Sequence, residues 1–255
     1  VVHGSALAIE PGETFTYEFV APEAGTFWYH PHIRSAFQIE AGLYGAFVVH
    51  EPEAMRPDVD HDRLFVLDDI RLDDDGSIAE HATGGMDVMH GRAGNVLLVN
   101  GASEPPRVDM VAGSVERWRL VNTANARTMV LRFPRLQVRE IGADAGLWPQ
   151  DWTRTIDELV LPVGARAELE VRLAPGEDRG DLTQVVLVSN GSGGVMEEEL
   201  QAVRVRAPSD AMEVRGAAGY TADPSVVMPD ADLDSPLTHT IALSGYNDNG
   251  QIVFT

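Results

Sequence analysis

Two histidines, His30 and His32, are separated by a single residue within the aromatic run GTFWYHPH. In an extended strand, residues i and i+2 point to the same face, so we expect both imidazoles to reach into one space. Imidazole is the commonest side-chain ligand of transition metals, and the pair could hold one ion together or one ion each. Two partly exposed histidines without a ligand would show the same spacing. Pro31 cannot donate to a sheet ladder, which indicates an edge or a bulge at this point.

Alternating apolar and polar residues predict β-strands along most of the chain. Phe15, Tyr17 and Phe19 share one face of the first strand, and further strands are predicted over 26–32 and 42–50. A second block of predicted strands covers 63–70, 95–101, 115–122, 128–133, 137–144, 165–173, 182–190 and 200–207, and one more begins at 238. Many short strands with turn residues between them predict an all-β fold of sandwich or barrel type.

The strand over 165–173 shows the alternation most clearly. The pattern places Leu169 and Val171 in the core, and Glu168 and Glu170 in solvent. The acidic run from Asp68 to Asp75 is interpreted as a solvated turn, because LDDDG lacks the spacing of a calcium loop.

The charge of the chain excludes several kinds of partner. The net charge is -21 and every basic residue is arginine, so we expect neither nucleic acid nor anionic membrane as a partner. The acidity is explained by solubility, although attraction of cationic substrates or metal ions is also possible. The chain has no cysteine, which excludes disulfides and thiolate metal ligands within it. No apolar run is long enough to span a bilayer.

The segment GTFWYHPH, followed by Gln38 and GLYGAFVV, resembles a motif of the multicopper oxidases of the bacterial, laccase-like type, and matches it at nearly every position. The stretches IEPGETFTYEF, NVLLVNG, AGSVERWRLVNTANAR, IGADAGLW and ELVLPVGARAELEV resemble other parts of the same family. The resemblance therefore covers almost the whole chain.

The resemblance implies cupredoxin-like Greek-key β-sandwich domains. It gives the C-terminal part of a first domain over 1–52, a linker over 53–62, a complete second domain over 63–207, a linker over 208–237 and the start of a third domain over 238–255. The chain is then expected to be a fragment that is inactive by itself and needs the missing parts of its own chain or adjoining domains.

The function implied by the resemblance is a copper-dependent, laccase-like oxidase. Such an enzyme oxidises a small phenolic, aromatic or metal-ion substrate by single electrons and reduces dioxygen to water at a trinuclear copper cluster. His30 and His32 would each bind one of two paired coppers, and the ligands of the mononuclear copper would lie outside this chain. A periplasmic or secreted location is also implied. The alternative is a copper-free scaffold or binding protein with the same fold.

Other polar residues are weaker candidates for a site. His81, Met86, Met89 and His90 have side chains that suit cuprous copper, but a surface loop with a packed methionine explains them better. We expect Asp144 to make structural hydrogen bonds. Trp148 and Trp152 could line a cleft against the third domain or pack in a core.

Overall fold

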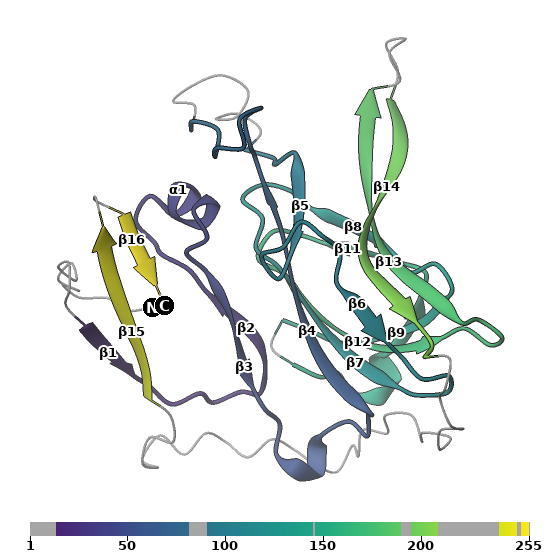
Figure 1. The fold of residues 1–255 in the computed structure, drawn as a ribbon. Coiled ribbons are helices and arrows are strands. Elements are labelled where there is room, and N and C mark those ends of the chain that lie inside the picture. The colour runs from purple at the N-terminus through teal and green to yellow at the C-terminus, as the bar shows by residue number, and fades with distance from the viewer. Residues whose placement is uncertain are drawn as a thin grey trace. The chain divides into compact units, whose positions relative to one another are not determined.

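The computed structural model describes residues 14–81, 91–144, 146–189, 195–208, 240–248 and 251–254 (Figure 1). It separates into two units, one formed by Val1–Glu23 with Met228–Thr255 and the other by Ala24–Val227. Strands dominate both units, which confirms the all-β, cupredoxin-like fold class. None of the helices in the described ranges has the length and apolar character that crossing a bilayer requires. The domain boundaries given above stay a prediction.

The first unit is a three-stranded antiparallel sheet in the order β1-β15-β16. Its strands are β1 (Thr14–Glu18), β15 (Thr240–Asp248) and β16 (Gln251–Phe254). The rings of Phe15 and Tyr17 meet edge to face with centroids 4.8 Å apart, which confirms that they share a face of β1.

The second unit begins with an antiparallel pair of strands, β2 (Gly25–Tyr29) and β3 (Gly45–Val49), which enclose the short helix α1 (Ser35–Glu40). The prediction of a strand over 26–32 was wrong at its end, because β2 stops at Tyr29. The helix was not predicted, and β3 starts three residues later than expected. Gly42, with φ +89°, follows the helix in the left-handed conformation that commonly ends helices.

Two facing sheets make up the rest of this unit. The six-stranded sheet has the order β10-β9-β12-β7-β4-β5, and the five-stranded sheet has the order β11-β8-β13-β14-β6. Neighbours pair antiparallel except β4 with β7 and β14 with β6. The strands are β4 (His61–Ile70), β5 (Val96–Val99), β6 (Arg107–Asp109), β7 (Glu116–Asn122), β8 (Met129–Arg132), β9 (Leu136–Ala143), β10 (Arg154–Ile156), β11 (Glu158–Leu161), β12 (Arg166–Leu173), β13 (Arg179–Ser189) and β14 (Val195–Arg206). Two 3₁₀ turns lie at Glu53–Met55 and Gln150–Trp152.

The core lies between these two sheets and confirms the predicted inward face of β12. Leu169 and Val171 are fully buried beside Trp118 of β7, whose ring contacts Phe65 of β4 with centroids 5.0 Å apart. The prediction for the other face of β12 was wrong, since Glu168 and Glu170 are also buried. For Glu168 the reason is that β2 contacts β7 and β12, and Thr26 of β2 binds its carboxylate. Glu170 instead pairs with the neighbouring arginines Arg139 and Arg172.

Candidate functional site

His30 and His32 lie in the loop that joins β2 to α1, and their rings are side by side. The ring centroids are 4.9 Å apart and the ring planes differ by 18°. The parallel rings agree with the expectation of a shared space, although the cause differs from the one predicted, because both residues lie beyond the end of β2. His30 is half-buried and His32 is exposed.

Trp28, the penultimate residue of β2, supports the pair from one side. Its ring stacks on His30 with centroids 4.2 Å apart and an angle of 25° between the planes. On another side Trp28 lies against the turn at Gly164, where an added Cβ would come within 3.6 Å of Trp28 Cζ2. Gly164 has φ +76°, a conformation that side chains rarely adopt. The Trp28 ring, on which His30 stacks, therefore packs against the turn that precedes β12.

The Nδ1 atom of His30 is 3.0 Å from the carbonyl oxygen of Pro31. A proton on Nδ1 would be donated to this carbonyl and would leave the lone pair of Nε2 available. Metal-binding histidines are commonly oriented by a hydrogen bond of this kind.

Helix α1 closes the loop that carries the histidines. Gln38 Nε2 donates to the carbonyl oxygen of Ile33, and the guanidinium of Arg34 lies over the Phe37 ring, 4.7 Å from its centroid. Gln38 thus holds the backbone of the loop. Gly45, at the start of β3, lies opposite Tyr29, and the Tyr29 ring packs over it: a Cβ there would come within 2.5 Å of Tyr29 Cζ unless the ring moved.

Glu40, the last residue of α1, attaches the helix to the sandwich. Its buried carboxylate accepts from the backbone N–H of Arg71 at 2.8 Å and from Asn125 Nδ2 at 2.9 Å, and it pairs with Arg92 at 3.3 Å. Sequence reasoning missed Glu40, since its partners lie far away along the chain.

Asp68 and Asp69 of β4 are buried, so the prediction that they belong to a solvated turn was wrong. Tyr44 donates its hydroxyl to Asp68 Oδ2 at 2.6 Å, and Arg127 Nε donates to Asp69 Oδ2 at 2.5 Å. Burial raises the pKa of Asp68 to about 6, against the lowering effect of the Tyr44 hydrogen bond. Burial, with the charge of Asp68, raises the pKa of Tyr44 as well. Asp75, further along the run, lies in an exposed turn as expected.

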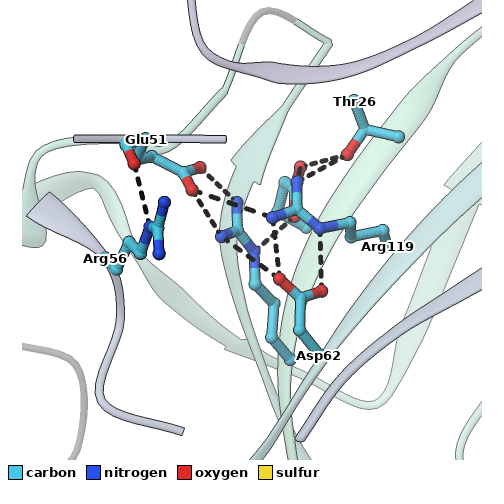
Figure 2. Close-up of polar contacts among 7 residues, drawn as sticks. Thr26, Glu51, Arg56, Asp62 and Arg119 are labelled. Atoms are coloured by element: carbon cyan, nitrogen blue, oxygen red, sulfur yellow. Dashed lines mark hydrogen bonds and ion pairs between the residues drawn. The ribbon is translucent and has the colours of Figure 1, made fainter. Parts of the chain in front are cut away.

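A buried ionic cluster joins β2 and the segment after β3 to the six-stranded sheet (Figure 2). Arg117 of β7 donates to both oxygens of Glu51, at 2.6 and 2.9 Å. Its Nε donates to Glu168 of β12 at 2.8 Å. Arg119 donates to both oxygens of Asp62 at 2.8 Å (Figure 2).

Thr26 completes the cluster from β2. Its hydroxyl donates to Glu168 Oε1 at 2.5 Å and accepts from Arg119 Nη1 at 3.0 Å. Both arginine side chains, Glu51 and Glu168 are at most 4% exposed, while Asp62 is 35% exposed. The cluster fixes β2, which carries Trp28 and leads into His30, against β7 and β12.

The charges of the cluster favour its ionised state. Burial alone would raise the pKa of Glu51, but the hydrogen bonds and charge of Arg117 outweigh burial and lower it. The pKa of Arg117 is raised, because its bonds to Glu51 and the charge of Glu168 outweigh the cost of burial. Two guanidinium groups here face three carboxylates, so every buried charge has an opposite partner.

The weaker candidates are placed as follows. Met86, Met89 and His90 lie outside the described residues, and the ring of His81 contacts Phe37 with centroids 5.4 Å apart. Asp144 accepts from the backbone N–H of Arg166 at 3.1 Å, which confirms its structural role. Trp152 is 69% exposed. In the described part of the chain, no three His, Cys, Asp or Glu side chains converge as a metal site.

The histidine pair fits a copper site in the chemistry of its donors. Imidazole nitrogens suit copper. Parallel rings supported on Trp28 present both side chains from one short loop. The imidazole nitrogens of His30 and His32 are therefore chemically suited to bind copper.

Comparisons with known proteins agree with this chemistry. A family model described as multicopper oxidase matches residues 1–54, which include both histidines. An L-ascorbate oxidase of Cucumis sativus is 55% identical over 49 residues, which are 19% of this chain and 8% of that protein. A multicopper oxidase of Staphylococcus aureus is 28% identical over 188 residues, which are 67% of this chain and 38% of that protein.

A solved structure extends the similarity to the fold. The crystal structure of a multi-copper oxidase from Pseudomonas thermotolerans matches with a TM-score of 0.71 and 28% identity, over 88% of this chain and 49% of that one. The chain thus spans well under half the length of these two curated relatives and about half of the solved structure.

Proposed function

The chain belongs to the multicopper oxidase family, and we propose that it serves a laccase-like, copper-dependent oxidase in which His30 and His32 are copper ligands. The reaction would be the one-electron oxidation of a small phenolic, aromatic or metal-ion substrate, coupled to the reduction of dioxygen to water. The single observation that carries the proposal is the parallel pair of imidazoles 4.9 Å apart within the segment matched by the family model.

Copper bound in a trinuclear cluster would supply the electron storage that reduction of dioxygen requires. The residues of this chain would bind the copper and hold the two ligand side chains in place. His30, with Nδ1 oriented toward the Pro31 carbonyl, would offer Nε2 as a ligand, and His32 would add the second imidazole. Trp28 limits the rotation of the His30 ring, because the two rings stack. Gln38 holds the backbone of the loop between the histidines and α1.

The proposal includes partners and a location. Because the pair supplies two ligands, the remaining ligands, including those of the mononuclear copper, would come from other parts of the protein or adjoining domains. A periplasmic or secreted location is proposed from the family alone.

Copper analysis of the full-length protein tests this function. We expect several copper ions per molecule in the wild type, a loss of copper in the variant with His30→Ala and His32→Ala, and no change in His50→Ala, which alters an exposed histidine outside the loop. Oxygen uptake with a phenolic dye and with cuprous ion should follow the copper content. A copper content near zero in the copper-loaded wild type would favour the alternative, a copper-free scaffold or binding protein.

A further inference from the structure

Arg166, the first residue of β12, joins three segments through one guanidinium group. Its Nε donates to the backbone carbonyl oxygen of Thr26 in β2 at 2.8 Å, and its Nη1 donates to the carbonyl oxygen of Gly164 at 3.1 Å. The same Nη1 lies 3.1 Å from Oδ1 of Asp144, the residue that follows β9. The side chain of Arg166 is 18% exposed, so it is largely shielded from water.

The backbone from which this side chain extends is itself held in place. The N–H of Asp144 donates to the carbonyl oxygen of Arg166 at 3.1 Å, and Asp144 Oδ1 accepts from the N–H of Arg166 at 3.1 Å. The segment after β9 and the start of β12 are thus tied to each other through backbone and side chain. The guanidinium group extends toward β2 from this fixed base.

The chain at the start of β2 meets these two segments at positions two residues apart. A Cβ on Gly146 would come within 2.5 Å of the carbonyl oxygen of Ala24, so the backbone there lies close to the start of β2. The carbonyl of Thr26 accepts from the guanidinium group. The ring of Trp28 lies beside Gly164, where a Cβ would be 3.6 Å from Trp28 Cζ2.

The last of these contacts leads directly to the histidine pair. Trp28 stacks on His30 with centroids 4.2 Å apart, and His30 stacks on His32 with centroids 4.9 Å apart. Arg166 binds both the strand from which Trp28 extends and the turn at Gly164 against which the Trp28 ring packs. A movement of either segment would therefore shift Trp28 and, with it, His30.

We propose that Arg166 is a positioning residue for the two copper ligands. It acts through Trp28, whose ring it keeps between the turn at Gly164 and His30. The inference rests on the proposed function, because it assigns Arg166 a task in copper binding. Loss of a residue that orients metal ligands commonly lowers metal affinity by about 10–100-fold, and we expect an effect of this size here.

NMR of the histidine ring protons in the metal-free, full-length protein tests the positioning itself. Because Trp28 is stacked on His30, the ring current of the indole shifts the His30 signals. Arg166→Met removes the bonds to both carbonyls and should change the His30 signals. Unchanged His30 signals in this variant would overturn the proposal.

Arg127→Met is the matched control. Arg127 also donates to one carboxylate and one backbone carbonyl, those of Asp69 and Gly94, and these partners lie outside β2 and the turns that contact it. The His30 signals should therefore stay as in the wild type. A change as large as that in Arg166→Met would show that the signals follow a general loss of stability, and would overturn the proposal.

Copper retention measures the consequence for the ligands. When the copper-loaded, full-length protein is titrated with EDTA, Arg166→Met should lose copper at an EDTA concentration at least about tenfold lower than the wild type, and Arg127→Met should not. Equal retention by Arg166→Met and the wild type would overturn the proposal. A wild type that holds no copper would instead refute the proposed function, while the NMR signals would still show whether Arg166 positions His30.

Gly164→Ala provides a second test if Arg166→Met does not fold. Gly164 has φ +76°, and Gly176, in the turn before β13, has φ +82°, so alanine is similarly strained at both positions. A Cβ at position 164 faces Trp28, whereas no atom of the described residues lies within 4 Å of a Cβ at position 176. Gly164→Ala should change the His30 signals and lower copper retention, and Gly176→Ala should do neither. Equal behaviour of the two alanine variants would overturn the proposal.

Discussion

Replacing Arg117 by methionine tests the buried ionic cluster that holds β2 on the six-stranded sheet. In the wild type, two arginines face three carboxylates, whereas in Arg117→Met three carboxylates face Arg119 alone. Glu51 loses a bidentate partner and Glu168 loses a bond of 2.8 Å, and both remain buried. Removal of one partner from a buried ion pair costs about 3–5 kcal/mol, so we expect a loss of this size in the free energy of unfolding.

Glu168→Gln provides a comparison of similar shape at the same place. It leaves two arginines facing Glu51 and Asp62, so the remaining charges balance. The amide oxygen can still accept from Arg117 or Thr26, and the expected loss is about 1–2 kcal/mol because charge-assisted bonds become neutral ones. Arg107→Met is the control, since Arg107 and its partner Asp109 are each 61% exposed and such pairs contribute little.

Urea unfolding followed by tryptophan fluorescence measures these changes. All four tryptophans lie in the unit Ala24–Val227, so the signal reports on the part that contains the cluster. A loss below about 1 kcal/mol for Arg117→Met, close to the value for an exposed pair, would refute the reasoning. A larger loss of unfolding free energy in Glu168→Gln than in Arg117→Met would refute the argument that the balance of buried charges determines the cost.

Three other substitutions test separate parts of the fold. Burial raises the pKa of Asp68 in the folded state to about 6, against an ordinary 3.8. The protonated carboxyl therefore stabilises the fold fully below about pH 4, and this stabilisation is lost as the pH rises to about 6. The free energy of unfolding measured in urea should fall by up to about 3 kcal/mol across this range in the wild type, and the fall should be absent in Asp68→Asn. Gly142→Ala should destabilise strongly, because the new Cβ would lie 2.9 Å from the backbone Cα of Leu147, and a lowered thermal midpoint would show it. Leu169→Ala should cost about 2–5 kcal/mol in urea, since the side chain is fully buried in the core; a loss under 1 kcal/mol would contradict this packing.

The strands were predictable because a period of two marks them in the sequence. Every strand predicted in 63–207 is present with ends shifted by a few residues, while three short strands, β6, β10 and β11, were missed. The three-residue strands β6 and β10 are too short to show an alternation, whereas β11, with four residues, was missed although β5 and β8, also with four, were predicted. Helix α1 was also too short to be predicted, since six residues complete fewer than two turns.

Burial of charged residues was harder to predict. Alternation correctly assigned Glu168 to the face opposite Leu169, but it could not show that β2 covers this face. Asp68, Asp69 and Glu168 each depend on partners at least 24 residues away along the chain. The histidine pair could be proposed from the sequence because its residue types are distinctive, and Trp28 is its neighbour along the chain. The contact of Trp28 with the turn at Gly164 could not be predicted, because it joins distant parts of the chain.

The chain from Glu51 to Asp62, which leads from β3 into the start of β4, is held at both ends: Glu51 binds Arg117 and Asp62 binds Arg119. Expression of residues 63–207 as an isolated piece would remove Glu51 and Asp62, and would leave Arg117 and Arg119 with Glu168 as their shared partner in the cluster. Mutational libraries and chimeras that exchange the histidine-bearing hairpin between relatives should carry Glu51, Asp62 and the two arginines together. An exchange that separates these residues would leave buried charges without their partners and should lower the free energy of unfolding.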